Sequence, residues 1–358
     1  MSQNLDWLIH DDWDEERPSA EETYQALRRS VERTTGFGLK FVQCNPAAGA
    51  DLRERLRQDL SGKLVQELVL DKSVHKLFDV ISEKIAQDGT PDVLCVVGLE
   101  YSLVEDIKPG NGGGEGDYYS PGTTPRILAH LNQNREKFRD SLSFNSIFFL
   151  PKFAQKYFIR RAADFVDWGS GIFELSVDKF TIAQEARQAF LSGDLDKCLG
   201  MTPKQQREKR IELQCLIEEC EEGITRHGLL LRLGGFLSIV NDWEGAIASY
   251  DKAIEFKPDD HEAWYKRGVA LGNLGCAEEA IASYDKALEI KPDAPSAWYG
   301  KACCHGLQGK VDLAIKNLTR AIELSPDKYR KMAQTGIDFD PIRSDPRFQA
   351  LLNPDISE

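Results

Sequence analysis

The chain has 358 residues and a formal net charge of −13, with 41% apolar and 29% charged residues. This length is enough for two or three domains, and the composition is typical of soluble globular proteins. The acidic charge argues against nucleic acid as the main partner, because binding phosphates requires a surplus of Lys and Arg on at least one face.

The sequence gives no sign of a membrane segment or of secretion. The longest apolar runs, such as residues 93–99, are far too short to cross a bilayer. The N-terminus is acidic and lacks the basic and apolar regions of a signal peptide. The eight cysteines form no C-x-x-C pair, which indicates reduced thiols. We therefore expect a cytoplasmic protein that does not associate with membranes.

Residues 1–20 form an acidic segment that contains Trp7 and Trp13. Such a segment is compatible with a docking motif, with a strap over the neighbouring domain, or with disorder. Its sequence favours none of the three.

From residue 21 to residue 175, short apolar segments alternate with amphipathic ones. The expected strands are residues 37–43, 64–70, 93–99, 146–150 and 171–175. The expected helices are residues 21–34, 51–60, 74–87, 126–140 and 152–163. This alternation predicts βαβ units and a three-layer α/β domain with a parallel sheet. The Gly- and Pro-rich residues 108–125 predict a surface loop within it.

A phosphate-binding loop would follow the first strand of such a sheet. Aligned with the pattern G-x-x-x-x-G-K-[ST], the chain retains only Gly49, while Cys44, Ala50 and Asp51 replace the first Gly, the Lys and the hydroxyl residue. These changes remove the phosphate-neutralising charge and the Mg²⁺ ligand. Glu100 is the only acid near the end of the third expected strand, and it could instead face solvent. We expect no cofactor and no metal, although backbone N–H groups alone could still bind a nucleotide weakly.

Three segments of this region carry a family resemblance, namely LNQNREKF (131–138), FFLP (148–151) and RAADFVDWGSGIFEL (161–175). They resemble the inactive P-loop NTPase-like domain that precedes helical repeats in bacterial multidomain regulators, a relative of the STAND signalling ATPases. The resemblance implies a degenerate NTPase fold over about residues 21–225. The chain departs from the family pattern at Gly169, where the family has an Arg, so an anion contact at this position is not expected.

Residues 176–226 are predicted to form a helical connector. Its segment 203–222 is a charged rod with a narrow apolar stripe of Ile211, Cys215 and Leu216.

The C-terminal third repeats itself every 34 residues. The recurring residues are Pro258, Pro292 and Pro326, then Ala246, Ala280 and Ala314, and then Ala253, Ala287 and Ala321. This pattern resembles a tetratricopeptide repeat (TPR) array, which implies an all-α solenoid of helix pairs that binds proteins. The expected repeats are residues 227–260, 261–294 and 295–328, and residues 329–358 are expected to cap them.

The partner of a TPR array lies against residues of the first helix in each repeat. The predicted partner-binding residues are Glu262, Tyr265, Lys266, Val269, Asn273, Ser296, Tyr299 and Cys303. Tyr265 and Tyr299 are the foremost candidates, although both could equally be ordinary half-exposed tyrosines. Leu231 and Gly235 occupy the positions at which chaperone-binding TPR proteins carry Lys and Asn, so a carboxylate tail is disfavoured as the ligand.

The sequence shows no catalytic constellation. The six histidines have no metal-ligand spacing, and no G-x-S-x-G motif is present. We therefore expect a non-enzymatic scaffold or adaptor in a bacterial signalling or defence-type assembly. The alternatives are a nucleotide-dependent regulatory switch with a residual ATP- or GTP-binding α/β domain and, with least support, an enzyme that uses the loop 108–125 as a lid.

Overall fold

The computed structural model describes residues 18–106, 124–175, 184, 186, 189, 198–220 and 223–353. Most of the acidic segment and of the Gly-rich loop discussed above lies outside these residues. The chain divides into two compact units. The first comprises Met1–Ser192 with Gly200–Glu222, and the second comprises Gly193–Leu199 with Gly223–Glu358.

The first unit is built on a parallel sheet of five strands. These are β1 (Gly38–Gln43), β2 (Val65–Val69), β3 (Val93–Val97), β4 (Asn145–Leu150) and β5 (Gly171–Glu174). Their order in the sheet is β2-β3-β4-β1-β5, and every neighbouring pair is parallel. Each strand lies within one residue of its predicted start and within two of its predicted end. The prediction of a parallel sheet is therefore confirmed.

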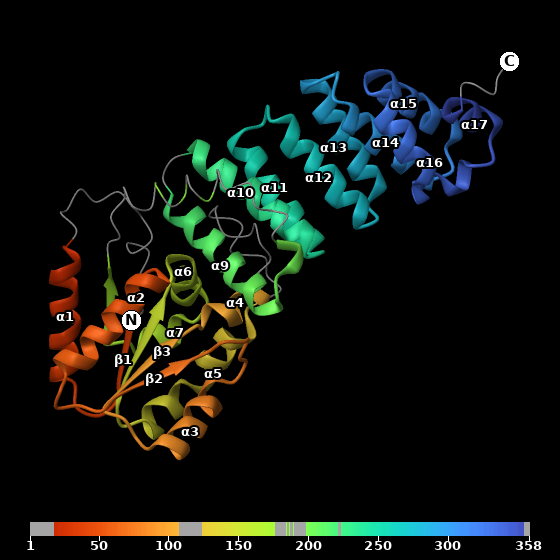
Figure 1. Cartoon of the computed structure of the whole chain (residues 1–358). Coiled ribbons are helices and arrows are strands. Elements are labelled where there is room, and N and C mark those ends of the chain that lie inside the picture. Colours follow the sequence, from red (N-terminus) through yellow and green to blue (C-terminus); the bar gives the residue numbers. More distant parts are fainter. Residues whose placement is uncertain are drawn as a thin grey trace. The chain divides into compact units, whose positions relative to one another are not determined.

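Helices cover both faces of the sheet (Figure 1). On one face, α1 (Ala20–Arg33) and α2 (Pro46–Asp59) pack against alternate residues of the strands. The helices on the other face are α3 (Leu77–Asp88), α4 (Glu100–Asp106), α5 (Arg126–Ser141), α6 (Lys152–Arg161) and α7 (Ala163–Val166). Because α2 follows β1 on one face and α6 follows the neighbouring β4 on the other, the carboxyl ends of β1 and β4 form the topological switch point of the sheet.

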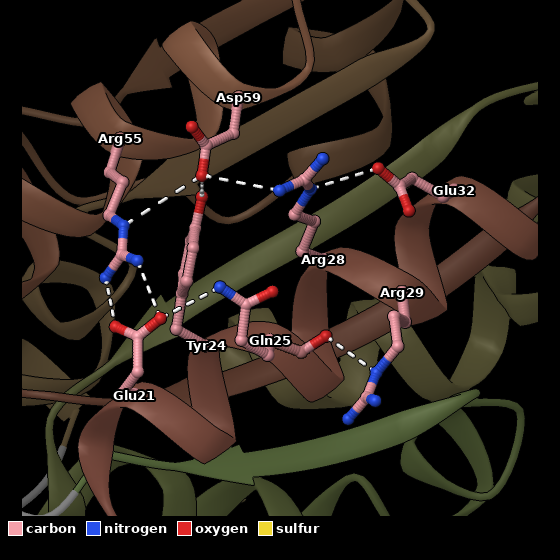
Figure 2. Close-up of polar contacts among 8 residues, drawn as sticks. All are labelled: Glu21, Tyr24, Gln25, Arg28, Arg29, Glu32, Arg55 and Asp59. Atoms are coloured by element: carbon pink, nitrogen blue, oxygen red, sulfur yellow. Dashed lines mark hydrogen bonds and ion pairs between the residues drawn. The ribbon is translucent and has the colours of Figure 1, made fainter.

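A polar network joins α1 to α2 (Figure 2). The side chain of Tyr24 is only 1% exposed, and its hydroxyl donates to Asp59 Oδ2 at 2.5 Å. The guanidinium of Arg55 lies 3.8 Å from the centroid of the Tyr24 ring and forms two hydrogen bonds with Glu21, at 2.6 and 2.8 Å. Such a bidentate, ring-stacked arginine fixes orientation as well as contact, so it holds α1 in register on α2.

Helix α9 (Pro203–Glu219) packs as part of the first unit. Ile211 and Cys215 of its predicted apolar stripe are buried in the same core as the strands and α6. Lys156 of α6 lies 3.1 Å from Glu218 of α9 and forms an ion pair with it. This helix of the predicted connector therefore packs as part of the first unit, because its apolar stripe completes the core of that unit.

The second unit consists of helices. Three helix pairs come first: α10 (Gly223–Ile239) with α11 (Trp243–Phe256), α12 (His261–Asn273) with α13 (Ala277–Ile290), and α14 (Pro295–Leu307) with α15 (Val311–Leu324). They are followed by α16 (Pro326–Thr335), the 3₁₀ helix η4 (Ile337–Ile342) and α17 (Pro346–Leu352). The first pair begins at Gly223, four residues before the predicted start of the first repeat. Among the described residues, no helix combines the length and the apolarity needed to cross a membrane.

Candidate functional site

Small residues let the paired helices approach one another closely. Ala246, Ala280 and Ala314 have no exposed surface, so the repeating alanines lie in the core as predicted. A Cβ added to Gly268 of α12 would lie 2.6 Å from the ring of Tyr284 on α13, so only glycine fits beneath this ring. Gly234 has the same relation to Tyr250 one repeat earlier, at 2.5 Å. This shared contact shows that the 34-residue period is a period of packing as well as of sequence.

The indole nitrogens fix the turns between the repeats. Trp264 Nε1 donates to the Pro258 carbonyl at 2.9 Å, and Trp298 Nε1 donates to the Pro292 carbonyl at the same distance. Models of the tetratricopeptide repeat match residues 240–275, 261–294 and 295–328. These residues are tetratricopeptide repeats. The second and third repeats have the predicted boundaries.

The five predicted partner-binding residues of the second TPR differ in their exposure. Glu262 and Asn273 are exposed, and Glu262 forms an ion pair with Lys266 one turn along α12, at 3.0 Å. Tyr265 and Val269 are half-buried on the same helix. The Tyr265 ring lies 6.0 Å from that of Tyr284, and burial raises the pKa of Tyr265. The structure thus brings the five predicted residues of this repeat together on α12.

The inner face of the third TPR is occupied by the chain itself. Tyr299 and Cys303 of α14 lie against η4, where the Tyr299 ring is 5.8 Å from Phe339. Burial and the charge of Asp338 raise the pKa of the Cys303 thiol. The third predicted residue, Ser296, is half-buried near the start of α14. Sequence reasoning treated Tyr299 and Cys303 as open to a partner, and it did not foresee that η4 folds back onto them.

Several solved structures resemble the chain, all with low sequence identity. MamA 41-end from Desulfovibrio magneticus RS-1 is 16% identical with a TM-score of 0.38, over 51% of this chain and 98% of that chain. YrrB, described as a TPR protein with an unusual peptide-binding site, is 19% identical with a TM-score of 0.34, over 42% and 88%. The first TPR of Spaghetti, bound to the HSP90 peptide SRMEEVD, is 20% identical with a TM-score of 0.28, over 30% and 90%. None of the curated protein sequences matches the chain.

The switch point of the sheet is the second place where a ligand could bind, and its helix N-terminus is already capped. Helix α2 starts three residues after β1 ends, so the residues aligned above with a phosphate-binding loop are mostly helical. The Asn45 side chain accepts from the Ala48 N–H at 2.7 Å, and the Asn45 carbonyl accepts from the Gly49 N–H at 2.9 Å. Pro46 has no N–H to donate.

Glu100 is buried at the carboxyl end of β3, which corrects the expectation that it could face solvent. Its side chain is 6% exposed, and one carboxylate oxygen, Oε2, has no hydrogen-bond partner among the described residues. Burial raises the pKa of Glu100 to about 7, so the acid is substantially protonated at neutral pH. Burial also raises the pKa of the nearby Cys44 thiol to about 12. A half-neutral acid and an uncharged thiol supply none of the positive charge that a phosphate would need.

Lys40 of β1 is a buried cation. Its side chain is fully buried on the α1–α2 face, where Nζ donates to Asn145 Oδ1 at 2.7 Å, Thr34 Oγ1 at 3.1 Å and Ser170 Oγ at 3.2 Å. Burial, together with the positive charge of Lys63, lowers the pKa of Lys40 to about 8. The only available signal was a lysine at an alternate, core-facing position of an apolar strand. Groups of three or more potential metal ligands are absent from the described residues.

Proposed function

We propose that this chain is a non-catalytic scaffold or adaptor, which binds a partner protein through the inner face of its TPRs. The observation that supports this proposal most directly comes from the second repeat. There Glu262, Lys266 and Asn273 remain accessible on α12, while the opposite side of this helix packs in the core. A TPR array buries its core between successive helices and leaves the inner face for other proteins. The side chains of this face are mixed in polarity, which suits a peptide segment better than a flat apolar surface.

Site-specific cross-linking tests this proposal. A photoreactive amino acid is placed at Asn273 on the inner face of the full-length chain, and in a control at Lys286, which is exposed on α13. We expect a discrete cross-linked partner from position 273 that is absent from position 286, and mass spectrometry identifies it. The same products from both positions, or none from position 273, would reject binding through the inner face.

We further propose that the first unit is a degenerate P-loop NTPase-like domain and that the assembly is a bacterial signalling or defence-type complex in the cytoplasm. The parallel sheet with helices on both faces supports the NTPase-like part. The capping of α2 by Asn45 and the burial of the Cys44 thiol and of the half-protonated Glu100 support the loss of nucleotide binding. The setting rests on the family resemblance of residues 131–175 and would be established by the identity of the cross-linked partner.

A titration with labelled ATP and GTP, with and without Mg²⁺, separates this proposal from the nucleotide-dependent switch. We expect no saturable binding to the full-length chain at micromolar nucleotide. Saturable, Mg²⁺-dependent binding would reject the degenerate-domain proposal and favour the switch, whatever the outcome of the cross-linking.

A further inference from the structure

The third repeat shows which chemistry its inner face accepts. Phe339 of η4 is fully buried there, beside Tyr299 and against Gly306 of α14. A Cβ added to Gly306 would lie 2.7 Å from the Asp338 carbonyl oxygen and 2.9 Å from the Phe339 ring. Glycine is therefore needed for the backbone and the aromatic ring of η4 to come this close to α14.

Arg343 fixes the segment between α16 and η4, which positions Phe339. Its guanidinium donates to the Gln334 carbonyl at 2.7 Å and to the Gly336 carbonyl at 2.6 Å, and it pairs with Asp340 at 2.7 Å. These bonds satisfy backbone carbonyls at the end of α16 and fix the path of the chain into η4. Phe339 is thus a fixed occupant of the third repeat.

The second repeat has an equivalent set of residues 34 positions earlier. Tyr265, Val269 and Gly272 correspond to Tyr299, Cys303 and Gly306. Gly306 is buried by η4, whereas Gly272 is half-exposed. Apart from its own helix backbone and chain neighbours, the nearest described atom to a Cβ on Gly272 would be the Tyr284 hydroxyl oxygen, at 4.0 Å. Among the described residues, the second repeat therefore has three equivalent positions, with α14 beside Tyr265 and open space over Gly272.

We propose that Tyr265, Val269 and Gly272 form a binding site for an aromatic side chain on an extended segment of a partner protein, as the third repeat binds Phe339. The inference rests on the proposed function and names the chemistry of the partner. It is carried by the internal repeat, because two equivalent sets of residues on the same fold offer a ring the same contacts. Such a ring would be flanked by the Tyr265 ring and would lie over the Gly272 backbone.

One difference between the two sets refines the ligand. Asp338, the residue before Phe339, lies close enough to Cys303 for its charge to add to the effect of burial in raising the pKa of the Cys303 thiol. Val269 at the equivalent position cannot hydrogen-bond with a carboxylate, so an acid before the aromatic residue gains nothing in the second repeat. The preferred partner segment therefore carries an apolar residue immediately before its aromatic residue.

The chain supplies its own probe for this site. A fluorescein-labelled peptide with the sequence of residues 335–343 (TGIDFDPIR), and a second with Leu in place of the first Asp, are titrated into the full-length protein by fluorescence anisotropy. We expect saturable binding with a dissociation constant on the order of 0.1 mM, which is typical of one anchoring side chain on a short flexible peptide. The Leu peptide should bind more tightly, and replacing the Phe by Ala should weaken binding at least about tenfold.

The variant Gly272→Leu fills the site, and Lys286→Leu is its control. Gly272 has room for a side chain, so the helix is expected to fold normally, which circular dichroism and thermal melting verify. Lys286→Leu adds the same side chain on the exposed surface of α13. We expect Gly272→Leu to weaken binding of the Leu peptide at least about tenfold and Lys286→Leu to leave it unchanged.

Two outcomes would overturn the inference. Absence of saturable binding of either peptide up to about 1 mM would exclude an aromatic site of useful affinity. Binding that Gly272→Leu does not weaken would place the peptide elsewhere, for instance in exchange with Phe339 in the third repeat. A partner cross-linked from position 273 together with either outcome would leave the scaffold proposal intact and remove only the aromatic site.

Discussion

The substitution Lys40→Met tests the electrostatics of the first unit most directly. Lys40 is fully buried, and its three hydrogen-bond partners are neutral oxygens of Asn145, Thr34 and Ser170. Its pKa falls from an ordinary value of 10.5 to about 8 in the folded chain. That difference corresponds to about 3 kcal/mol of destabilisation of the folded state wherever the lysine is protonated in both states.

The sign of the pH dependence follows from proton binding. Between about pH 8 and about pH 10.5 the unfolded chain binds the proton more tightly than the folded chain, so the free energy of unfolding rises with pH in this window. From about pH 7 to about pH 10, Lys40 should contribute a gain of about 2 kcal/mol in the wild-type chain. Lys40→Met removes this gain. At neutral pH the variant should be nearly as stable as the wild type, because relief of the buried charge offsets the loss of the donor to Asn145 Oδ1, which costs about 1–3 kcal/mol.

The measurement is urea-dependent hydrogen exchange of peptides that cover β1 and β4, because these report on the first unit without the repeats. The unfolding free energies of wild type and variant are subtracted at about pH 7 and again at about pH 10, and the two differences are compared. The subtraction cancels the contributions of other groups that titrate in alkali. Lys72→Met, at an exposed position, is the control and should show no such difference. A Lys40→Met difference that does not change with pH would refute the reasoning, since it would mean that Lys40 is not held against its protonated form.

Three further predictions concern the core and the switch point. Gly268→Ala places a Cβ 2.6 Å from the Tyr284 ring and should lower the free energy of unfolding of the repeats by about 1–3 kcal/mol. Gly272→Ala has room for the added methyl group and should raise this free energy by up to about 1 kcal/mol. Equal melting temperatures for the two variants would contradict this prediction. Asn45→Ala removes the N-cap of α2 and should cost about 1 kcal/mol in urea denaturation. Since the pKa of Glu100 is raised to about 7, the folded chain binds its proton more tightly, and stability falls as pH rises from 4.5 to about 7. Glu100→Gln should therefore stabilise the first unit by roughly 2–3 kcal/mol above neutral pH and little at pH below 4.5, and a pH-independent difference would count against it.

Much of the architecture follows from local patterns. Continuous apolar runs and amphipathic segments predicted the five strands and the helices α1, α3, α5 and α6 to within a few residues, because a strand buried on both faces must be apolar along its length. The short helices α4 and α7 were not predicted. The 34-residue period predicted the repeats, because each helix pair repeats the same close contact between a small residue and a large one, as at Gly268 and Tyr284. The start of α2 was predicted five residues too late. The prediction assumed a phosphate-binding loop after β1, whereas Asn45 caps α2 directly after the strand ends.

The candidate site depended on tertiary structure to a greater degree. The sequence alone determined that the chain carries tetratricopeptide repeats and which residues of α12 and α14 share one side of a helix, since periodicity is a local property. Only the tertiary structure decided which of these residues remain accessible. Segment 336–342 has no periodicity that predicts its contact with α14. Its placement depends on hydrogen bonds from Arg343 to the Gln334 and Gly336 carbonyls and on the space above Gly306. Contacts of this kind join residues that no local pattern relates, so the second repeat was distinguished from the third only once the chain was folded.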